Sequence, residues 1–198
     1  MTAELIAFGY RVSGADASAG MLARARQRLG PDVVLLHEAL PALTIDEVFD
    51  AAVSTLDGLN YLTPEELRTA LSALHARIRP GGWFIFDVHT DAMMTFAVAN
   101  PTITGESHGM RFAITNAVDV RARICRSQID VVRTGDGEAF AEDHLQHFFT
   151  ESEIRTALID AGFEVVEVTD EYTHAPVVAS TLRATWVARR PMVPSPEA

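Results

Sequence analysis

The chain contains a single cysteine, Cys125, among its 198 residues. One cysteine excludes an internal disulfide framework and cannot build a structural zinc site, which needs several Cys or His ligands. No H-x-x-x-H pair or comparable cluster offers another metal site, so we expect no metal. We interpret Cys125 as a buried or half-buried strand residue in a cytoplasmic, reducing setting.

Long apolar runs and positive charge are also scarce. No apolar run approaches the ~20 residues that span a bilayer, and the start, MTAELIAFGY, lacks the features of a signal peptide. The chain has 16 Lys and Arg against 27 Asp and Glu, a formal net charge of −11. Binding to a phosphate backbone needs clustered cations, so we do not expect a nucleic acid as partner. We expect no membrane partner either, because no apolar run is long enough to span a bilayer.

The composition is that of an ordinary folded domain, with 48% hydrophobic and 22% charged residues. A chain of this length can bury a substantial core. We therefore predict one domain over residues 1–190. The Pro-rich stretch 191–198 is expected to be a disordered tail.

The first half of the chain alternates strands and helices, which predicts a parallel sheet. Helix boundaries come from the capping boxes Thr63–Glu66 and Thr150–Glu153 and from glycine stops. The predicted strands are Tyr10–Ala15, Val33–Leu36, Phe49–Ser54 and Trp83–Val88. The predicted helices are Thr2–Phe8, a helix from Ser18 to about Gly30, and one from Thr63 to about Ile78, which Arg79–Gly82 breaks.

The pattern changes between Met110 and Phe149, where three β runs predict a small antiparallel lid over residues 110–149. These runs are Arg111–Val118, Arg123–Arg133 and Ala139–Phe149, and Thr134–Gly137 forms the turn of a hairpin. A helix follows over Glu151–Ala161. Two last strands, Phe163–Thr169 and Leu182–Arg189, are joined only by a loop, so we expect them to pair antiparallel.

Asp16 stands at the end of the first predicted strand and just before a helix. A carboxylate at that place in an α/β sheet accepts hydrogen bonds from both hydroxyls of a ribose. The alternative is an acid that the helix dipole favours. The surrounding run, GYRVSGADASAGMLARARQRL, resembles the second strand and following helix of class I S-adenosylmethionine (SAM)-dependent methyltransferases at ten positions in register. The phrases RPGGWFIFDV and AGFEVVEV resemble the same family's fifth and sixth strands.

The resemblance implies an α/β fold with a Rossmann-like sheet that is mostly parallel, with the last strand antiparallel. It implies SAM as cofactor and transfer of its methyl group to an N or O atom of a small molecule. The family's first strand and its glycine-rich loop are missing from this chain. We expect either that the native protein begins upstream of Met1 or that another segment or chain fills the gap.

The resemblance also places cofactor-binding residues after the second, third and fourth strands of the family. Ala39 stands where the family often has an Asp that accepts from adenine, so that hydrogen bond is not provided there. For the segment after the fourth strand, the alternative is a loop packed on the sheet. The predicted cofactor-binding residues are Asp16, Ala17, Met21, Ala39, Leu40, Thr55, Leu56, Asn60 and Tyr61.

Three residues are candidates for catalysis. Asp87 and His89 end the strand Trp83–Val88, on the edge where open α/β sheets bind ligands, and either could take a proton from an acceptor. His144 shares one face of a lid strand with Glu142, which allows a His–carboxylate pair. The alternative for His144 is a polar residue on a half-exposed strand.

Two rival functions stay open at this point. One is a truncated, non-catalytic methyltransferase-like domain. The other is a nicotinamide-dependent oxidoreductase, since an acid after the second strand suits that ribose too. For the methyltransferase itself the expected partner is a small-molecule methyl acceptor, and a homodimer is a further expectation, whereas the non-catalytic domain would serve as an interaction partner.

Overall fold

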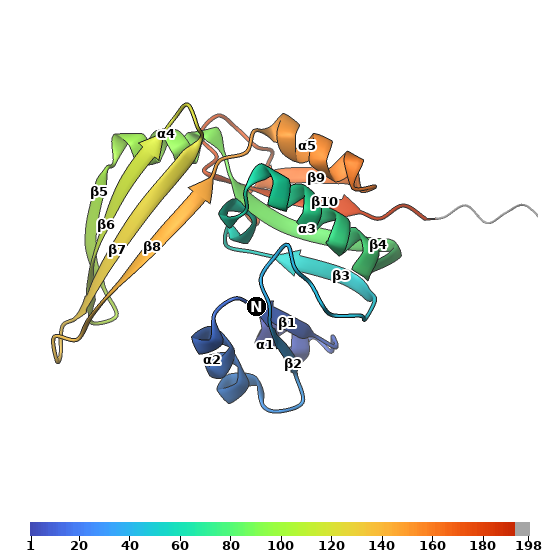
Figure 1. The fold of residues 1–198 in the computed structure, drawn as a ribbon, viewed down its shortest axis with the longest axis horizontal. Coiled ribbons are helices and arrows are strands. Elements are labelled where there is room, and N and C mark those ends of the chain that lie inside the picture. The colour runs from blue at the N-terminus through green and yellow to red at the C-terminus, as the bar shows by residue number, and fades with distance from the viewer. Residues whose placement is uncertain (193–198) are drawn as a thin grey trace, which may run out of the picture. The chain divides into compact units, whose positions relative to one another are not determined.

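The computed structural model describes residues 1–192, which group into two compact units (Figure 1). The first unit is Met1–Asp46 and the second begins at Glu47. Most of the tail predicted over 191–198 lies outside the described residues, and the interpretation of 1–190 as one domain stays a prediction. Within the described residues, no helix has the length and apolar character to cross a membrane.

The first unit is a parallel strand pair with two helices. It contains α1 (Thr2–Ala7), β1 (Ser13–Asp16), α2 (Ala19–Leu29) and β2 (Val34–His37). β1 and β2 pair in parallel, so that Asp16 lies opposite His37. The hydroxyl of Ser18 accepts from the backbone N–H of Met21 and caps α2. The first strand begins at Ser13 rather than at the predicted Tyr10, whose side chain is exposed.

The second unit contains a four-stranded sheet in the order β3-β4-β10-β9. Its strands are β3 (Phe49–Ser54), β4 (Ile78–His89), β9 (Glu164–Asp170) and β10 (Arg183–Arg189). β3 and β4 pair in parallel, whereas β10 is antiparallel to both β4 and β9. The prediction of a parallel arrangement that finishes with an antiparallel strand is confirmed.

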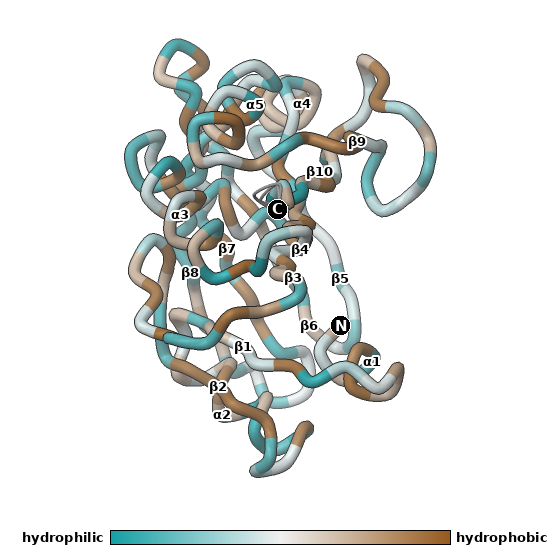
Figure 2. Tube along the Cα trace, turned by 90° about the vertical axis from the view of Figure 1, so that its right-hand side faces the viewer, coloured by the Kyte–Doolittle hydropathy of each residue, from teal (hydrophilic) through white to brown (hydrophobic). Residues whose placement is uncertain are grey.

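Two helices, α3 (Pro64–Arg77) and α5 (Glu151–Asp160), pack together against this sheet (Figure 1). Both start with the predicted capping boxes, built on Thr63 and Thr150. Apolar and polar residues alternate along these helices in Figure 2, as expected for helices with one buried side. Beneath them, the aromatic rings of Phe84, Phe86 and Trp186 stack in the core.

The helix α3 ends just before Arg79–Gly82, as predicted, but β4 starts earlier than predicted because these four residues already lie inside the strand. Gly81 has a φ of +79°, a backbone conformation that favours glycine. A Cβ on Gly82 would lie 2.6 Å from the backbone oxygen of Asp50, so only glycine allows this close approach to β3. The two glycines therefore shape an irregular start of β4, directly after the helix that they were predicted to break.

The lid is a separate antiparallel sheet in the order β5-β6-β7-β8, with α4 (Asp91–Ala99) before it. Its strands are β5 (Thr102–Ser107), β6 (Met110–Asp119), β7 (Ile124–Arg133) and β8 (Ala139–His147). The sequence predicted three of the four strands and neither β5 nor α4. Cys125 is buried, as expected, in a small core with Met94, Ala97 and Phe148.

Candidate functional site

Polar side chains gather where β3 and β4 end. Since the two strands are parallel, their carboxyl ends meet at the same edge. β8 of the lid, the residues after β9 and the start of β10 reach this edge as well. We call the resulting group the Asp57–Asp87 cluster. Its members are Asp57, Asp87, His89, Gln146, Tyr172 and Arg183.

Asp87 anchors the loop that follows β3. Its carboxylate is fully buried and accepts from the backbone N–H of Leu56 at 2.8 Å and of Asp57 at 2.6 Å. The hydroxyl of Tyr172 donates to the same carboxylate, and Arg183 Nε lies 3.4 Å from it. These contacts occupy the carboxylate with donors from its own protein, which supports a positioning role for Asp87.

The loop held by Asp87 is strained. Leu56 and Asp57 have φ values of 61° and 53°, in the left-handed region that non-glycine residues rarely adopt. Leu56 is largely exposed, so packing of its side chain does not explain this conformation. The two backbone hydrogen bonds to Asp87 explain it, because both N–H groups must turn toward one buried carboxylate.

Asp57 forms the second acidic centre of the cluster. It accepts from Arg183 Nη2 at 2.8 Å and from Gln146 Nε2 at 2.6 Å. Sequence reasoning missed all three of these residues. Asp57 stands in the loop already assigned to the site, and Gln146 shares a face of β8 with His144, so both carried a signal. Arg183 carried none, because its place opposite His89 depends on strand register.

His89 is buried beside Asp57, with its Nε2 atom 3.6 Å from Asp57 Oδ1. Burial lowers the pKa of His89, and the Asp57 carboxylate offsets part of that effect. The imidazole is therefore neutral near pH 7 and able to accept a proton. Its Nδ1 atom has no hydrogen-bond partner among residues 1–192.

Asn60 lies inside the protein and links the site to the lid. Its Oδ1 atom accepts from the backbone N–H of His89 at 3.0 Å, and its Nδ2 atom donates to the carbonyl of His147 at 2.7 Å. The side chain is fully buried. The structure thus engages both polar atoms of this predicted cofactor-binding residue in internal hydrogen bonds.

A hydrogen-bonded chain of three side chains joins the loop after β3 to β8. Tyr61 ends the short 3-10 helix η1 (Gly58–Tyr61). Its hydroxyl oxygen lies 2.7 Å from His144 Nδ1. His144 Nε2 lies 3.1 Å from Glu142. A carboxylate only accepts, so Nε2 carries the proton and Nδ1 accepts from Tyr61. Burial and the charges of Asp57 and Glu142 raise the pKa of Tyr61, which keeps its hydroxyl protonated.

The remaining predicted cofactor residues divide between the two units. Asp16 ends β1 and accepts the backbone N–H of Ser18 at 2.7 Å, the contact expected of an acid at a helix start. Ala17 and Met21 are exposed beside it. Ala39 and Leu40 follow β2, the strand paired with β1. In the second unit, Thr55 and Leu56 belong to the loop that Asp87 holds.

Metal chemistry has no candidate centre in the described part of the chain. Within residues 1–192, no group of three or more His, Cys, Asp or Glu side chains could hold a metal ion.

The chain is similar to methyltransferases in sequence. Residues 1–82 match the Methyltransf_25 family, described as a methyltransferase domain. The protein YqeM of Bacillus subtilis (strain 168), named provisionally as a methyltransferase, is 25% identical over 188 residues, which cover 92% of this chain and 76% of YqeM.

Solved structures share the fold. A SAM-dependent methyltransferase from Clostridium acetobutylicum ATCC 824 superposes with a TM-score of 0.84 at 21% identity, over 92% of this chain and 76% of that one. The sugar N-methyltransferase KedS8 from Streptoalloteichus sp. ATCC 53650 gives a TM-score of 0.68 at 19% identity, over 90% and 70% of the two chains. The chain therefore has the fold of these SAM-dependent methyltransferases.

Proposed function

We propose that this chain methylates the nitrogen of a small-molecule amine, with amino sugars as the first class to test. The observation that carries the proposal is the Tyr61–His144–Glu142 chain, which supplies a proton acceptor at the carboxyl edge of β3. An amine is largely protonated near pH 7, so it must lose a proton before its nitrogen can be methylated. The similarity to KedS8, a sugar N-methyltransferase, supports the choice of nitrogen and of a sugar.

The proton path follows from the hydrogen bonds. The substrate ammonium gives its proton to the Tyr61 oxygen as Tyr61 passes its own proton to His144 Nδ1. The resulting imidazolium is stabilised by Glu142 at Nε2. His89, neutral and next to Asp57, is a second candidate for accepting the proton.

The residues that would hold SAM are those of the prediction. Asp16 accepts one internal hydrogen bond, at Oδ1, so its Oδ2 atom fits a ribose hydroxyl. Leu40 is half-buried and suits the adenine ring, whereas Ala39 offers that ring no side-chain acceptor. SAM, when bound, supplies a methyl group on a sulfonium whose sulfur leaves with the bonding electrons as nitrogen bonds to the carbon. Asp87 contributes by fixing the loop that carries Thr55 and Leu56, since positioning is most of the catalysis that such a transfer needs.

Titration calorimetry with S-adenosylhomocysteine tests the cofactor part of the proposal. We expect binding that Asp16→Ala weakens by about tenfold or more, because charge-assisted hydrogen bonds contribute about 1.5–3 kcal/mol. Asp32→Ala, which removes an exposed acid on the loop after α2, is the matched control. Absence of binding at millimolar ligand would instead favour a non-catalytic domain.

Transfer of a labelled methyl group from SAM to a panel of amino sugars tests the chemistry. His144→Gln should lower the transfer rate near pH 7 and recover as the pH rises, because the free amine then needs no base. A rate that falls equally at every pH would contradict the proton path. An NADH-dependent absorbance change without methyl transfer would favour an oxidoreductase.

A further inference from the structure

The lid sheet carries two rows of paired residues that are apolar except for Glu142. Residues paired across strands share one face of a sheet, and side chains alternate between the two faces along each strand. Both rows lie on the face that holds His144, because Glu142 and Phe140 stand two and four positions before it in β8. We call the two rows the lid apolar face. The first row contains Ile103, Ile114, Ile129 and Glu142, and the second contains Gly105, Phe112, Val131 and Phe140.

The opposite face of the same sheet is mainly polar. Its side chains come from the positions that alternate with those of the lid apolar face. They include the exposed residues Thr104, Arg111, Thr115, Arg126, Gln128, Asp130 and Asp143. A sheet that turns a polar face to water normally buries its apolar face against a partner.

Helix α4 covers the near end of this side of the lid. Its residues Met94 and Ala97 form a small core with Cys125 and Phe148. Cys125 is 3% exposed, whereas Phe140, at the far end of the lid apolar face, is 48% exposed. Apolar surface therefore becomes accessible beyond the part that α4 covers, and continuous surface of this kind marks a binding site.

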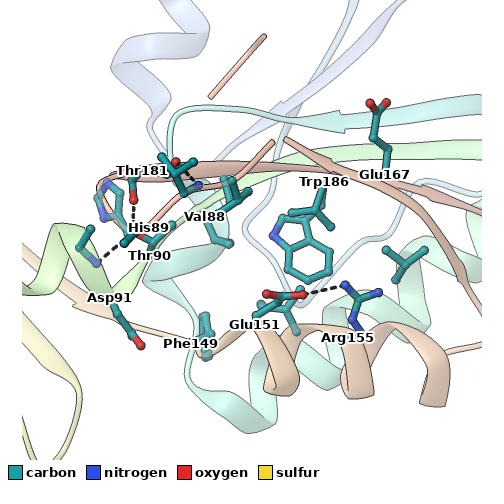
Figure 3. Close-up of a pocket in the computed structure, with 18 of the residues that line it drawn as sticks. Val88, His89, Thr90, Asp91, Phe149, Glu151, Arg155, Glu167, Thr181 and Trp186 are labelled. Atoms are coloured by element: carbon teal, nitrogen blue, oxygen red, sulfur yellow. Dashed lines mark hydrogen bonds and ion pairs between the residues drawn. The ribbon is translucent and has the colours of Figure 1, made fainter. Parts of the chain in front are cut away.

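The lid is tied to the main sheet through the start of α4. The hydroxyl of Thr90, the N-cap of α4, donates to the carbonyl of Thr181 (Figure 3). Asp91 pairs with Arg123, which precedes β7. His89 lies beside these residues at the end of β4 in Figure 3. These contacts hold the lid at the carboxyl edge of β4, where the candidate site lies.

The lid apolar face is continuous with the candidate base. His144 contacts Tyr61 on one side and Glu142, a member of the first row, on the other. A strand rises about 3.4 Å per residue, so Phe140 lies about 14 Å from His144 along β8. A substrate whose nitrogen lies at Tyr61 would therefore place an attached group along these two rows.

The charge of this face favours a cation as the occupant. Glu142 is the one charged residue of the two rows. Its carboxylate repels a carboxylate or phosphate on a ligand and attracts a protonated amine. The occupant that fits both the apolar rows and this charge is an amine with a hydrophobic group.

We propose that the lid apolar face binds the hydrophobic part of the methyl acceptor, so that the acceptor is an amphipathic amine. Its hydrophobic group should extend about 7–14 Å from the nitrogen, the distance that the two rows span from His144. The inference rests on the proposed function and adds the class of substrate to it. Among amino sugars, those that carry a hydrophobic substituent should be methylated best.

Two glycosides of glucosamine test the inference. Octyl and methyl 2-amino-2-deoxy-β-glucoside carry the same amine and differ only in the length of the alkyl chain. Each buried CH₂ group strengthens binding by about threefold to fourfold. In labelled-methyl transfer from SAM, with both glycosides below the micelle concentration, we expect the octyl glycoside to have a KM at least about tenfold lower and a similar kcat.

Two neighbouring valines on β7 supply matched variants. Val131 belongs to the lid apolar face, whereas Val132 lies on the opposite face, and both are half-buried. Val131→Thr and Val132→Thr make the same change of a methyl group to a hydroxyl. Val131→Thr should raise the KM of the octyl glycoside by about threefold or more and leave that of the methyl glycoside unchanged, and Val132→Thr should change neither.

Titration calorimetry with the same two glycosides gives a readout that does not depend on transfer. If neither glycoside is methylated, the proposed transfer to amino sugars fails, but octyl binding that Val131→Thr weakens and Val132→Thr does not would still support the face as a site for amphipathic amines. If both glycosides are methylated with equal KM, or if the two valine variants act alike, the inference is overturned and the proposed function stands. A dimer in sedimentation experiments that Val131→Thr dissociates would also overturn it, because the face would then join two copies of the chain.

Discussion

The buried Asp87 carboxylate offers the sharpest test of how the site is held together. Asp87→Asn keeps the size of the side chain and removes its charge. An amide presents one oxygen and one NH₂ group, so only one of the backbone N–H groups of Leu56 and Asp57 can keep residue 87 as its acceptor. Among the described residues, the only other acceptor for these N–H groups is the Tyr172 hydroxyl, 3.2 Å from Leu56 N. The other donor then faces an NH₂ group.

The expected cost follows from these contacts. One buried N–H without an acceptor costs about 1–3 kcal/mol, and the hydrogen bond that survives loses its charge assistance. We therefore expect Asp87→Asn to lower the free energy of unfolding by about 2–4 kcal/mol, out of a total of about 5–15 kcal/mol for a typical domain. The strained φ values at Leu56 and Asp57 make relaxation of the loop an additional consequence.

Urea denaturation followed by circular dichroism measures the difference. Asp50→Asn is the matched control, because Asp50 is 86% exposed and its ion pair with Arg79 lies at the surface. Such pairs contribute about 0–1 kcal/mol. The reasoning fails if the two variants lower stability equally, since that would show that the carboxylate of Asp87 does not hold the loop.

Three further predictions concern the rest of the chain. The free energy of unfolding should fall as the pH is lowered from about 7.5 to 5.5, because burial lowers the pKa of His75 and His89 in the folded protein. Below about pH 6.5 the unfolded chain therefore binds more protons than the folded one. Urea denaturation at several pH values should show that the free energy of unfolding depends less on pH in His89→Gln than in the original chain. Gly82→Ala should cost about 1–3 kcal/mol in the same assay, since the new Cβ lies 2.6 Å from a backbone oxygen of β3, whereas Gly135→Ala, with no atom nearby, should stay within about 0.5 kcal/mol. Thr63→Ala should lower the thermal midpoint by removing the α3 cap, a loss of about 1 kcal/mol.

Elements with a local signal were predictable from the sequence. The capping boxes at Thr63 and Thr150 mark α3 and α5 because both hydrogen bonds of a capping box lie within four consecutive residues. The sequence also predicted that β10 pairs antiparallel with β9, because the segment between the two strands was interpreted as a loop without a crossover helix. These features need no knowledge of the tertiary structure.

The missed elements depend on partners far along the chain. β5 has the sequence TITGES, with little apolar character, and becomes a strand because β6 supplies its hydrogen-bond partners. Its Gly105 lies against the ring of Phe112, a contact no local pattern reveals. The continuation of β4 through Gly81 and Gly82 likewise depends on a distant partner, because the backbone groups of both glycines hydrogen-bond to Arg190, just after β10.

The candidate site was predictable only in part, for the same reason. The sequence could place Asp87 and His89 at the end of a strand, where ligands bind. It could not show that Tyr172, 85 residues away, donates to Asp87, or that Arg183 lies between Asp57 and Asp87. Strand register and loop closure set these contacts, and the assignment of Asp87 to positioning depends on them.

The charge balance of the Asp57–Asp87 cluster indicates which kind of methyl acceptor suits the carboxyl edge of β3 and β4. Asp57 and Asp87 carry two negative charges against the one positive charge of Arg183, and burial keeps His89 neutral. The edge is therefore negative, and a cation gains more there than an anion does. Methylation of an amine moves positive charge onto the acceptor nitrogen, so a negative edge favours the product side of that transfer. This balance supports an amine over a carboxylate as acceptor, independently of the similarity to a sugar N-methyltransferase.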